Sequence, residues 1–328
     1  MHSLNFAEAI GEAILEEMER DASVIVQGED VGRYGGGYYP ALKGLWEKFG
    51  CERVRDFPIS ETAIVGTAVG AAMTGLRPIV DIMFADFMFV CIDEIINQAA
   101  KMRYMSGGVA KVPLVVRGVH GAYSNLASQH SHSPEAVLCQ FPGIIVVTPS
   151  SARTAKGLLK SSIRSDDPVV FLEHKVLFTL PAEDVPADSE FLLPLGKAEI
   201  IHQGRDVTIV ANSYQTRLAL LAAERLAPRG VNAEVIDLLT ITPLDKTTIN
   251  QSVYKTGRLV CIQESPPMCG LAAEVITCVM ESGISLSSAP QRVTGKQAPI
   301  PFSPALEPIV LPSVDDIVQA VTKVMTTK

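Results

Sequence analysis

Several common sequence features are missing from this chain, and each absence argues against a class of protein. No run of about 18 apolar residues occurs, so we expect no membrane span. No block of lysine and arginine occurs and the net charge is −8, which argues against nucleic acid as a partner. Six cysteines form no C-x-x-C pair, and no secretory signal pattern opens the chain. We therefore expect free thiols in a reducing compartment and a cytoplasmic protein.

The sequence motifs of several large enzyme classes are missing too. There is no G-x-x-x-x-G-K-[ST] loop, which argues against a P-loop nucleotide enzyme, and no G-x-S-x-G elbow, which argues against an α/β-hydrolase. The glycines of the loop over residues 28–44 follow a strand but lack the G-x-G-x-x-G spacing of a dinucleotide site. The chain therefore has no phosphate-binding loop of a familiar kind.

The hydrophobic pattern alternates between strand and helix along most of the chain. Its 328 residues are 47% hydrophobic and 20% charged, as in a globular protein of about two domains. Apolar runs predict strands over residues 23–27, 78–84, 113–118, 143–149, 168–173, 206–212, 232–238 and 258–264. Helical periodicity predicts helices over residues 6–20, 61–75, 92–105, 151–165, 213–227, 269–282 and 313–325. This alternation predicts two α/β domains, each built on a parallel sheet.

A stretch rich in proline and acidic residues interrupts the alternation near the middle of the chain. Prolines and charges at this density are typical of a connector between domains. We therefore predict a first domain over residues 1–180, a connector over residues 181–203 and a second domain over residues 204–328.

One glutamate, Glu61, begins a helix that is made almost entirely of small residues. Ser60 is a good N-cap, and a carboxylate in the first turn gains roughly 0.3–1 kcal/mol from the helix dipole. This reading does not explain why bulky side chains are missing behind Glu61. Gly66 and Gly70 lie four residues apart and share one face, which suits the close approach of a backbone or a flat ligand ring.

Three further side chains admit more than one reading from their positions alone. His130 and His132 lie in a polar loop over residues 119–134, where they suit local hydrogen bonding, acid–base catalysis or metal binding. Phe87 follows a strand directly, where core packing is the usual role and stacking on a ligand ring is the alternative.

A set of motifs in a fixed order identifies a family. GEDV (28–31), PISE (58–61), GTAVGAAMTGLRPI (66–79), INQAAKMRYMSGG (96–108), QHSHSPEA (129–136), PGIIVVTPSSARTAKGLL (142–159), DDPVVFLEHK (166–175), TPLD (242–245) and PIPFSPALE (299–307) occur along the chain. They closely resemble the β subunit of the thiamine-diphosphate-dependent decarboxylase component of 2-oxo acid dehydrogenase complexes, an oxidoreductase. The resemblance covers nearly the whole chain.

The resemblance implies a pyrimidine-binding α/β fold followed by a transketolase C-terminal-like domain. It implies an α2β2 heterotetramer whose cofactor lies between α and β, with the pyrophosphate and Mg²⁺ of thiamine diphosphate held by the α subunit. It also implies a lipoyl-bearing acyltransferase as a second partner, and a bound monovalent cation, K⁺.

The resemblance assigns roles to four side chains. Glu61 matches the glutamate that hydrogen-bonds the aminopyrimidine ring nitrogen and so promotes nucleophile formation on the cofactor. Phe87 matches an aromatic residue that packs on the same ring, and Glu29 matches an acid that lines the site. His130 matches the histidine that protonates the lipoyl dithiolane, whereas His132 stands where relatives often carry glutamine.

The resemblance also bears on the cation and on the substrate. Relatives bind K⁺ through carbonyl groups, and Ile163, Ser165 and Asp167 stand at the matching positions. The segments FADFMFVCIDEIINQAAKMRYM, FLEHK and PFSPALE look most like acetoin dehydrogenase β subunits, whereas HSHSPEA resembles the branched-chain type. Val90 stands where pyruvate-type relatives carry glutamine.

Acetoin or pyruvate is therefore the favoured substrate, with branched-chain 2-oxo acids as the alternative. A self-sufficient transketolase is disfavoured by the length of the chain, because such enzymes also carry the pyrophosphate domain. A non-catalytic scaffold that binds the acyltransferase core is disfavoured by the presence of Glu61 and His130.

Overall fold

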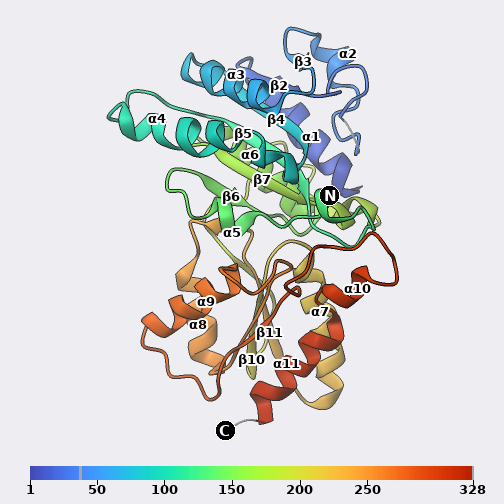
Figure 1. The fold of residues 1–328 in the computed structure, drawn as a ribbon, viewed down its shortest axis with the longest axis vertical. Helices are drawn as coiled ribbons and strands as arrows, with labels where there is room; N and C mark the ends of the chain where they lie inside the picture. The colour runs from blue at the N-terminus through green and yellow to red at the C-terminus, as the bar shows by residue number, and fades with distance from the viewer. Residues whose placement is uncertain (37–38, 327–328) are drawn as a thin grey trace. The chain divides into compact units, whose positions relative to one another are not determined.

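The chain folds into two compact units in the computed structural model, which describes residues 1–36 and 39–326 (Figure 1). The first unit comprises residues 1–120 and 137–195, and the second comprises residues 121–136 and 196–328. The predicted loop over residues 28–44 includes residues 37 and 38, which lie outside the described residues.

The first unit is built on parallel strands in the order β6-β7-β5-β4-β2-β3. Their bounds are β2 Val24–Gly28, β3 Val54–Asp56, β4 Arg77–Phe84, β5 Val115–His120, β6 Ile145–Val147 and β7 Val169–His174. Every residue of β2, β5 and β7 is buried. Strands covered on both faces need apolar side chains at successive positions, which explains the continuous apolar runs of the sequence.

Helices of the first unit form two packed groups. Helix α1 (Phe6–Arg20) packs on α6 (Ala152–Arg164), and its buried apolar face includes Ile10, Ile14 and Met18. Helix α3 (Glu61–Met73) packs on β4 and on the residues that precede α4. Further helical segments of this unit are α2 Leu45–Phe49, the 3-10 turn Ala85–Phe89, the π-helical turn Glu94–Ala99, α4 Ala100–Met105, the end of α5 Glu135–Leu138 and the 3-10 turn Lys175–Thr179.

The predicted helix over residues 92–105 is not a regular α-helix. Residues Glu94–Ala99 form a π-helical turn, and Ala100–Met105 form the α-helix that follows it. The Asp93 carboxylate accepts hydrogen bonds from Asn97 at 2.6 Å and Gln98 at 3.4 Å. Asp93 therefore bonds the side chains four and five residues ahead, and the five-residue spacing is that of a π-helix.

The predicted connector over residues 181–203 contains two strands. Strand β8 (Glu183–Val185) pairs antiparallel with β1 (His2–Leu4), and β9 (Glu199–His202) pairs antiparallel with β11 (Ala233–Asp237). Both strands pair with segments outside the connector, so the local composition of the connector did not predict them.

The second unit has a five-stranded sheet in the order β14-β13-β10-β11-β9. Its further strands are β10 Val207–Ala211, β13 Leu259–Ile262 and β14 Gln291–Val293, all parallel, and β12 (Thr240–Thr242) also belongs to this part of the chain. Its helical segments are α7 Tyr214–Leu226, α8 Lys246–Thr256, α9 Leu271–Glu281, α10 Glu307–Val310, α11 Val314–Thr326 and the 3-10 turn Ala227–Arg229.

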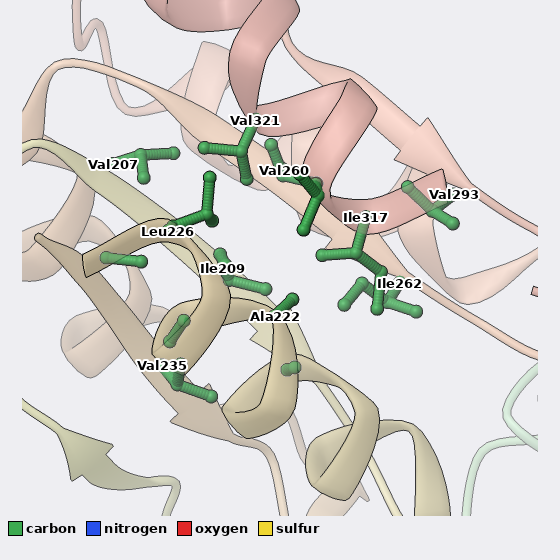
Figure 2. Close-up of a cluster of buried hydrophobic side chains, with 14 of the residues drawn as sticks. Val207, Ile209, Ala222, Leu226, Val235, Val260, Ile262, Val293, Ile317 and Val321 are labelled. Carbon is green, nitrogen blue, oxygen red and sulfur yellow. The ribbon is translucent and has the colours of Figure 1, made fainter. Parts of the chain in front are cut away.

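Aliphatic side chains of α7 and α11 form the core of the second unit (Figure 2). Leu226 of α7 and Val321 of α11 are buried with Ile209, Val235 and Val260, which come from three neighbouring strands. Helices α8 and α9 pack on each other and on β10 and β13 respectively. The unit is therefore a sheet with a helix pair on each side, as Figure 1 shows.

The prediction of two α/β domains built on parallel sheets is confirmed for the fold class, and the main sheets are mostly parallel. The antiparallel strands β1, β8 and β9 make the fold mixed rather than purely parallel. Across the described residues, no helix has the length and apolar character needed to cross a membrane.

Candidate active site

Three of the predicted site residues gather at one edge of the first unit's sheet. Glu29 directly follows β2, Glu61 begins α3 after β3, and Phe87 lies in the 3-10 turn Ala85–Phe89 that follows β4. Strands β3, β2 and β4 are adjacent and parallel, so their carboxyl ends meet at the same edge. Open α/β sheets bind ligands outside this edge.

Close contacts fix the chain where it leaves these strands. A Cβ on Gly28 would lie 2.4 Å from the carbonyl oxygen of Asp81, so only glycine allows β2 to end this close to β4. The buried side-chain amide of Gln27 donates to the carbonyl of Ile64 at 2.6 Å and to the hydroxyl of Thr67 at 3.0 Å. These bonds hold α3 against β2, and so fix the helix that begins with Glu61.

The pKa of one carboxylate at this edge, that of Glu29, is raised by its surroundings. Burial raises the pKa of Glu29, and the negative charges of Asp30 and Glu61 raise it further. Like charges at short range disfavour the ionised form, so Glu29 holds its proton more tightly than an isolated glutamate does.

Ser60 occupies the N-cap position of α3 but makes no capping hydrogen bond through its side chain. The prediction that Ser60 caps this helix is therefore wrong. Asn5 and Ser151 cap α1 and α6 with ψ angles of 173° and 165°, whereas the ψ of Ser60 is 82°. This different backbone angle explains why the Ser60 hydroxyl does not reach the first-turn N–H groups.

The small residues of α3 leave one face of the helix open. A Cβ on Gly70 would meet no atom of the described residues within 4 Å, and a Cβ on Gly66 would meet only the side chain of Glu94, at 3.5 Å. The sequence predicted a close approach at this face. Within the described part of the chain nothing approaches Gly70, so the face is available to another molecule.

Cys91 lies close to the same edge and is buried. Burial raises the pKa of its thiol to about 12, with smaller contributions from the charges of Glu94 and Glu61. A thiol with this pKa stays protonated near neutral pH and is not a nucleophile. Cys91 therefore contributes packing rather than chemistry.

Phe87 is half-buried, and its ring meets the ring of Phe84 edge to face, with centroids 6.2 Å apart. The hydroxyl of Thr62 in α3 donates to the carbonyl of Val90 at 3.1 Å, which ties the turn of Phe87 to the start of the helix. Val90 itself is 58% exposed. Phe87 thus packs on Phe84 and keeps part of its surface accessible.

The predicted histidines lie in the second unit, on the loop that follows β5. This histidine loop comprises residues 121–136. His130 ends the 3-10 turn Ser128–His130 and is half-buried, whereas His132 is exposed. The two side chains therefore have different surroundings, although one residue separates them.

A pocket of about 380 Å³ adjoins the histidine loop within the second unit. His132 lines it, and His130 does not. The other residues that line it are Ser128, Ser131, Ser133, Glu264, Ser265, Pro266, Gly295, Lys296, Gln297, Ala298, Pro299, Ile300 and Val310.

Glu135 lies near the end of the histidine loop and is buried. Burial raises the pKa of Glu135 to about 7, and the charge of Glu264 adds to this effect. Sequence reasoning missed both residues. Glu264 stands at the carboxyl end of the predicted strand 258–264, a position where functional groups of α/β proteins collect, and this signal could have identified it.

The turn predicted to hold K⁺ is bonded to an arginine. The carbonyl oxygens of Ile163 and Ser165 accept hydrogen bonds from the guanidinium of Arg77 at 3.0 and 2.9 Å. The carbonyl of Asp167 accepts one from the hydroxyl of Ser165 at 3.0 Å. A potassium ion would have to share these oxygens with a guanidinium cation, so this arrangement does not fit a cation site.

No group of three or more histidine, cysteine, aspartate or glutamate side chains suited to a metal ion occurs within residues 1–36 and 39–326.

Comparisons with family models match both halves of the chain. Residues 2–180 match the transketolase pyrimidine-binding domain, and residues 196–317 match the transketolase C-terminal domain. One solved structure, titled a split-gene transketolase in an inactive β4 tetramer, aligns over the whole of both chains with a TM-score of 0.80 and 23% identity. At this identity the likeness concerns the fold.

Curated relatives match at higher identity. The chain is 48% identical to pyruvate dehydrogenase E1 component subunit beta-1 of Arabidopsis thaliana, across 95% of this chain and 87% of the relative. It is 46% identical to pyruvate dehydrogenase E1 component subunit beta of Rickettsia felis, across 97% of each chain. It is 44% identical to the acetoin:2,6-dichlorophenolindophenol oxidoreductase subunit beta of Cupriavidus necator, across 98% of this chain and 97% of the relative.

Proposed function

Because this chain belongs to the family of pyruvate dehydrogenase and acetoin oxidoreductase β subunits, we propose that it forms the pyrimidine side of a thiamine diphosphate site. An α subunit completes this site in an α2β2 enzyme. The observation that carries the proposal is the gathering of Glu29, Glu61 and Phe87 at one sheet edge, beside the open small-residue face of α3.

Each of these side chains has a physical role in the proposal. Thiamine diphosphate, when bound, supplies the carbon nucleophile and the electron sink for cleavage of a bond next to a carbonyl group. Glu61 holds a proton on the ring nitrogen of the pyrimidine, and Phe87 offers its accessible ring surface for packing. Glu29 supplies a second acid whose raised pKa suits retention of a proton beside Glu61.

His130 acts in the later transfer of the acyl group to a lipoyl group of the acyltransferase partner. In this step the S–S bond of the lipoyl ring breaks. One sulfur bonds the acyl carbon, and the other takes the proton that His130 donates. The cleaved substrate supplies the two electrons that reduce the disulfide.

The α subunit holds the pyrophosphate and Mg²⁺ in this proposal. The open face of α3 supports the idea of a partner chain, because Gly66 and Gly70 allow a backbone to come close to the helix. The compartment that we propose is the cytoplasm, which suits six thiols that form no disulfide among the described residues.

Acetoin or pyruvate is the proposed substrate. The relatives named for pyruvate and for acetoin match at similar identity, 46–48% and 44%. Val90, which directly follows the turn that contains Phe87, is exposed and apolar. Unlike the glutamine that pyruvate-type relatives carry at this position, it offers no hydrogen bond to a substrate. The alternatives are a branched-chain 2-oxo acid as substrate, and a scaffold role without catalysis.

Co-expression with the α subunit tests the proposal. Thiamine-diphosphate-dependent dye reduction by the purified complex is compared for pyruvate, acetoin and 3-methyl-2-oxobutanoate. We expect turnover with pyruvate or acetoin to exceed that with the branched acid. Preference for the branched acid would replace the proposed substrate, and failure with all three would contradict the dehydrogenase function.

A further inference from the structure

The histidine loop has a strained backbone. Tyr123, Asn125 and Ala127 have φ angles of 64°, 54° and 62°, in a region that residues with a Cβ rarely adopt. Ala127 combines this φ with a ψ of −174°, a conformation found almost only in glycine. Such a conformation is unfavourable and persists only where its surroundings hold it.

One carboxylate joins the two ends of this loop. The Glu264 side chain accepts a hydrogen bond from the backbone N–H of Ala122 at 2.7 Å and from the hydroxyl of Ser133 at 3.0 Å, both through Oε1. Its Oε2 accepts from the side-chain amide of Gln215 on α7 at 3.0 Å. Glu264 is only 6% exposed, so these bonds form away from bulk water and are stronger for it.

A second carboxylate holds the strained segment between those ends. Glu307, at the start of α10, is 3% exposed and accepts hydrogen bonds from the backbone N–H groups of Ser124 and Asn125 at 3.1–3.3 Å. The hydroxyl of Tyr123 donates to the carbonyl of Pro312 at 2.7 Å. Three successive residues of the loop are thus bonded to the segment that contains α10.

Another side of the loop borders the pocket described above. Ser128, Ser131, His132 and Ser133 line the 380 Å³ pocket, so this side faces open space. The buried hydroxyl of Ser131 makes no hydrogen bond to any described residue. The carboxylate bonds, together with the backbone hydrogen bond from the N–H of Gly121 to the carbonyl of His132 at 2.9 Å, therefore hold the loop that carries His130.

We propose that Glu264 and Glu307 are positioning residues that hold the strained histidine loop and thereby place His130 for proton donation. This inference rests on the proposed role of His130 in acyl transfer to the lipoyl group. Neither carboxylate is assigned contact with substrate or cofactor. Their substitution therefore affects acyl transfer while it spares the earlier cleavage step.

Glu264 allows a matched pair of variants. In Glu264→Gln the amide oxygen keeps the bonds from Ala122 and Ser133. The new amide nitrogen can donate to Gln215, whose buried side-chain oxygen makes no hydrogen bond within the described residues. In Glu264→Ala every one of these bonds is lost. The first variant therefore retains the contacts without the charge.

The experiment uses the α2β2 complex with two electron acceptors. Dye reduction reports substrate cleavage, and reductive acylation of a lipoylated domain of the acyltransferase reports the transfer step. For Glu264→Ala we expect kcat with the lipoyl domain to fall by about 10²-fold, because a displacement of about 1 Å has an effect of this size. Its dye reduction should stay within about twofold of the unchanged enzyme, since cleavage does not use His130.

Two controls separate positioning from general destabilisation. Glu264→Gln should restore most of the lipoyl-dependent rate. Glu234→Ala removes another buried carboxylate of the second unit, which bonds Lys255 rather than the histidine loop, and should not change the ratio of the two rates. Glu307→Ala, which removes the bonds to Ser124 and Asn125, should resemble Glu264→Ala.

The outcomes are distinguishable. Equal losses of both rates in Glu264→Ala and Glu234→Ala would show a structural effect only and would overturn the inference. Unchanged lipoyl-dependent rates in Glu264→Ala and Glu307→Ala would overturn it too. Absence of dye reduction in the unsubstituted complex would instead contradict the proposed function.

Discussion

Glu29 and Glu61 follow different strands of the first unit, yet the charge of Glu61 acts on Glu29. Burial makes the largest contribution to the raised pKa of Glu29, and the charges of Asp30 and Glu61 add to it. The two acids thus lie close enough for one to affect the pKa of the other, at the sheet edge where we place the pyrimidine.

Substitution of Glu61 by glutamine should lower the pKa of Glu29. The change removes one of the two negative charges that disfavour ionisation of Glu29, and it leaves the burial of Glu29 unchanged. A ¹³C NMR titration of the glutamate carboxyl groups in the isolated chain measures this pKa. An unchanged midpoint in Glu61→Gln would contradict the coupling of the two acids.

Glu135 should make the stability of the chain depend on pH. Its pKa rises from an ordinary value of 4.5 to about 7 through burial and the charge of Glu264. The folded chain therefore binds this proton more tightly than the unfolded chain does. The resulting stability is fully present below pH 4.5 and is lost as the pH rises to about 7.

The loss should be on the order of 3 kcal/mol, at about 1.4 kcal/mol per pH unit. Urea unfolding at pH 4.5 and pH 8 measures it for the unsubstituted chain and for Glu135→Gln, which carries no charge at either pH. We expect a smaller pH-dependent loss in the variant. Equal losses in both proteins would show that Glu135 does not titrate in this range.

Substitutions of Gly70 should affect the stability of the isolated chain and its assembly with the α subunit differently. Its position is open, so Gly70→Ala and Gly70→Leu should each stabilise α3 by about 1 kcal/mol, through a higher helix propensity than glycine. The leucine side chain would then occupy the face that we assign to the α subunit. Thermal unfolding of the isolated chain and size-exclusion chromatography with α measure the two effects.

We expect both Gly70 variants to raise the melting temperature, and only Gly70→Leu to weaken assembly strongly. Normal assembly of Gly70→Leu would place the α subunit elsewhere.

The activity of the complex should not require potassium. Arg77 already donates to the carbonyls of Ile163 and Ser165, and it forms an ion pair with Asp166 at 2.7 Å. We expect equal dye reduction in K⁺ and Na⁺ at the same ionic strength. A rate lost in Na⁺ and restored by K⁺ would show that a cation binds despite the guanidinium.

Much of the fold could be predicted because its central strands are covered on both faces. Strands β2, β4, β5, β7 and β10 appear in the sequence as apolar runs, and these runs gave their positions to within a few residues. Helix α8 was missed for a physical reason. Its core-facing side includes Ser252 and Thr256, whose hydroxyls bond that of Thr208 at 2.7 Å, so its hydrophobic pattern is weak.

Some residues of the candidate site could likewise be predicted from the sequence, and others could not. Glu61 and His130 were found through motifs, and the family read from those motifs is confirmed. Their catalytic roles remain predictions. The position of Glu264 at the end of a predicted strand was a usable signal, but the bonds of Glu264 and Glu307 to the histidine loop join segments that are 142 and about 180 residues apart. Such pairings depend on the folded chain, and no local pattern indicates them.

The central claim is that Glu61 takes part in the chemistry of the bound cofactor. The most direct measurement is the steady-state rate of dye reduction by the α2β2 complex that carries Glu61→Gln, with the preferred substrate and saturating thiamine diphosphate. We predict a fall in kcat of about 10²-fold or more, with assembly unchanged, because a positioned acid–base group contributes about this much. Turnover equal to that of the unsubstituted complex would contradict the account.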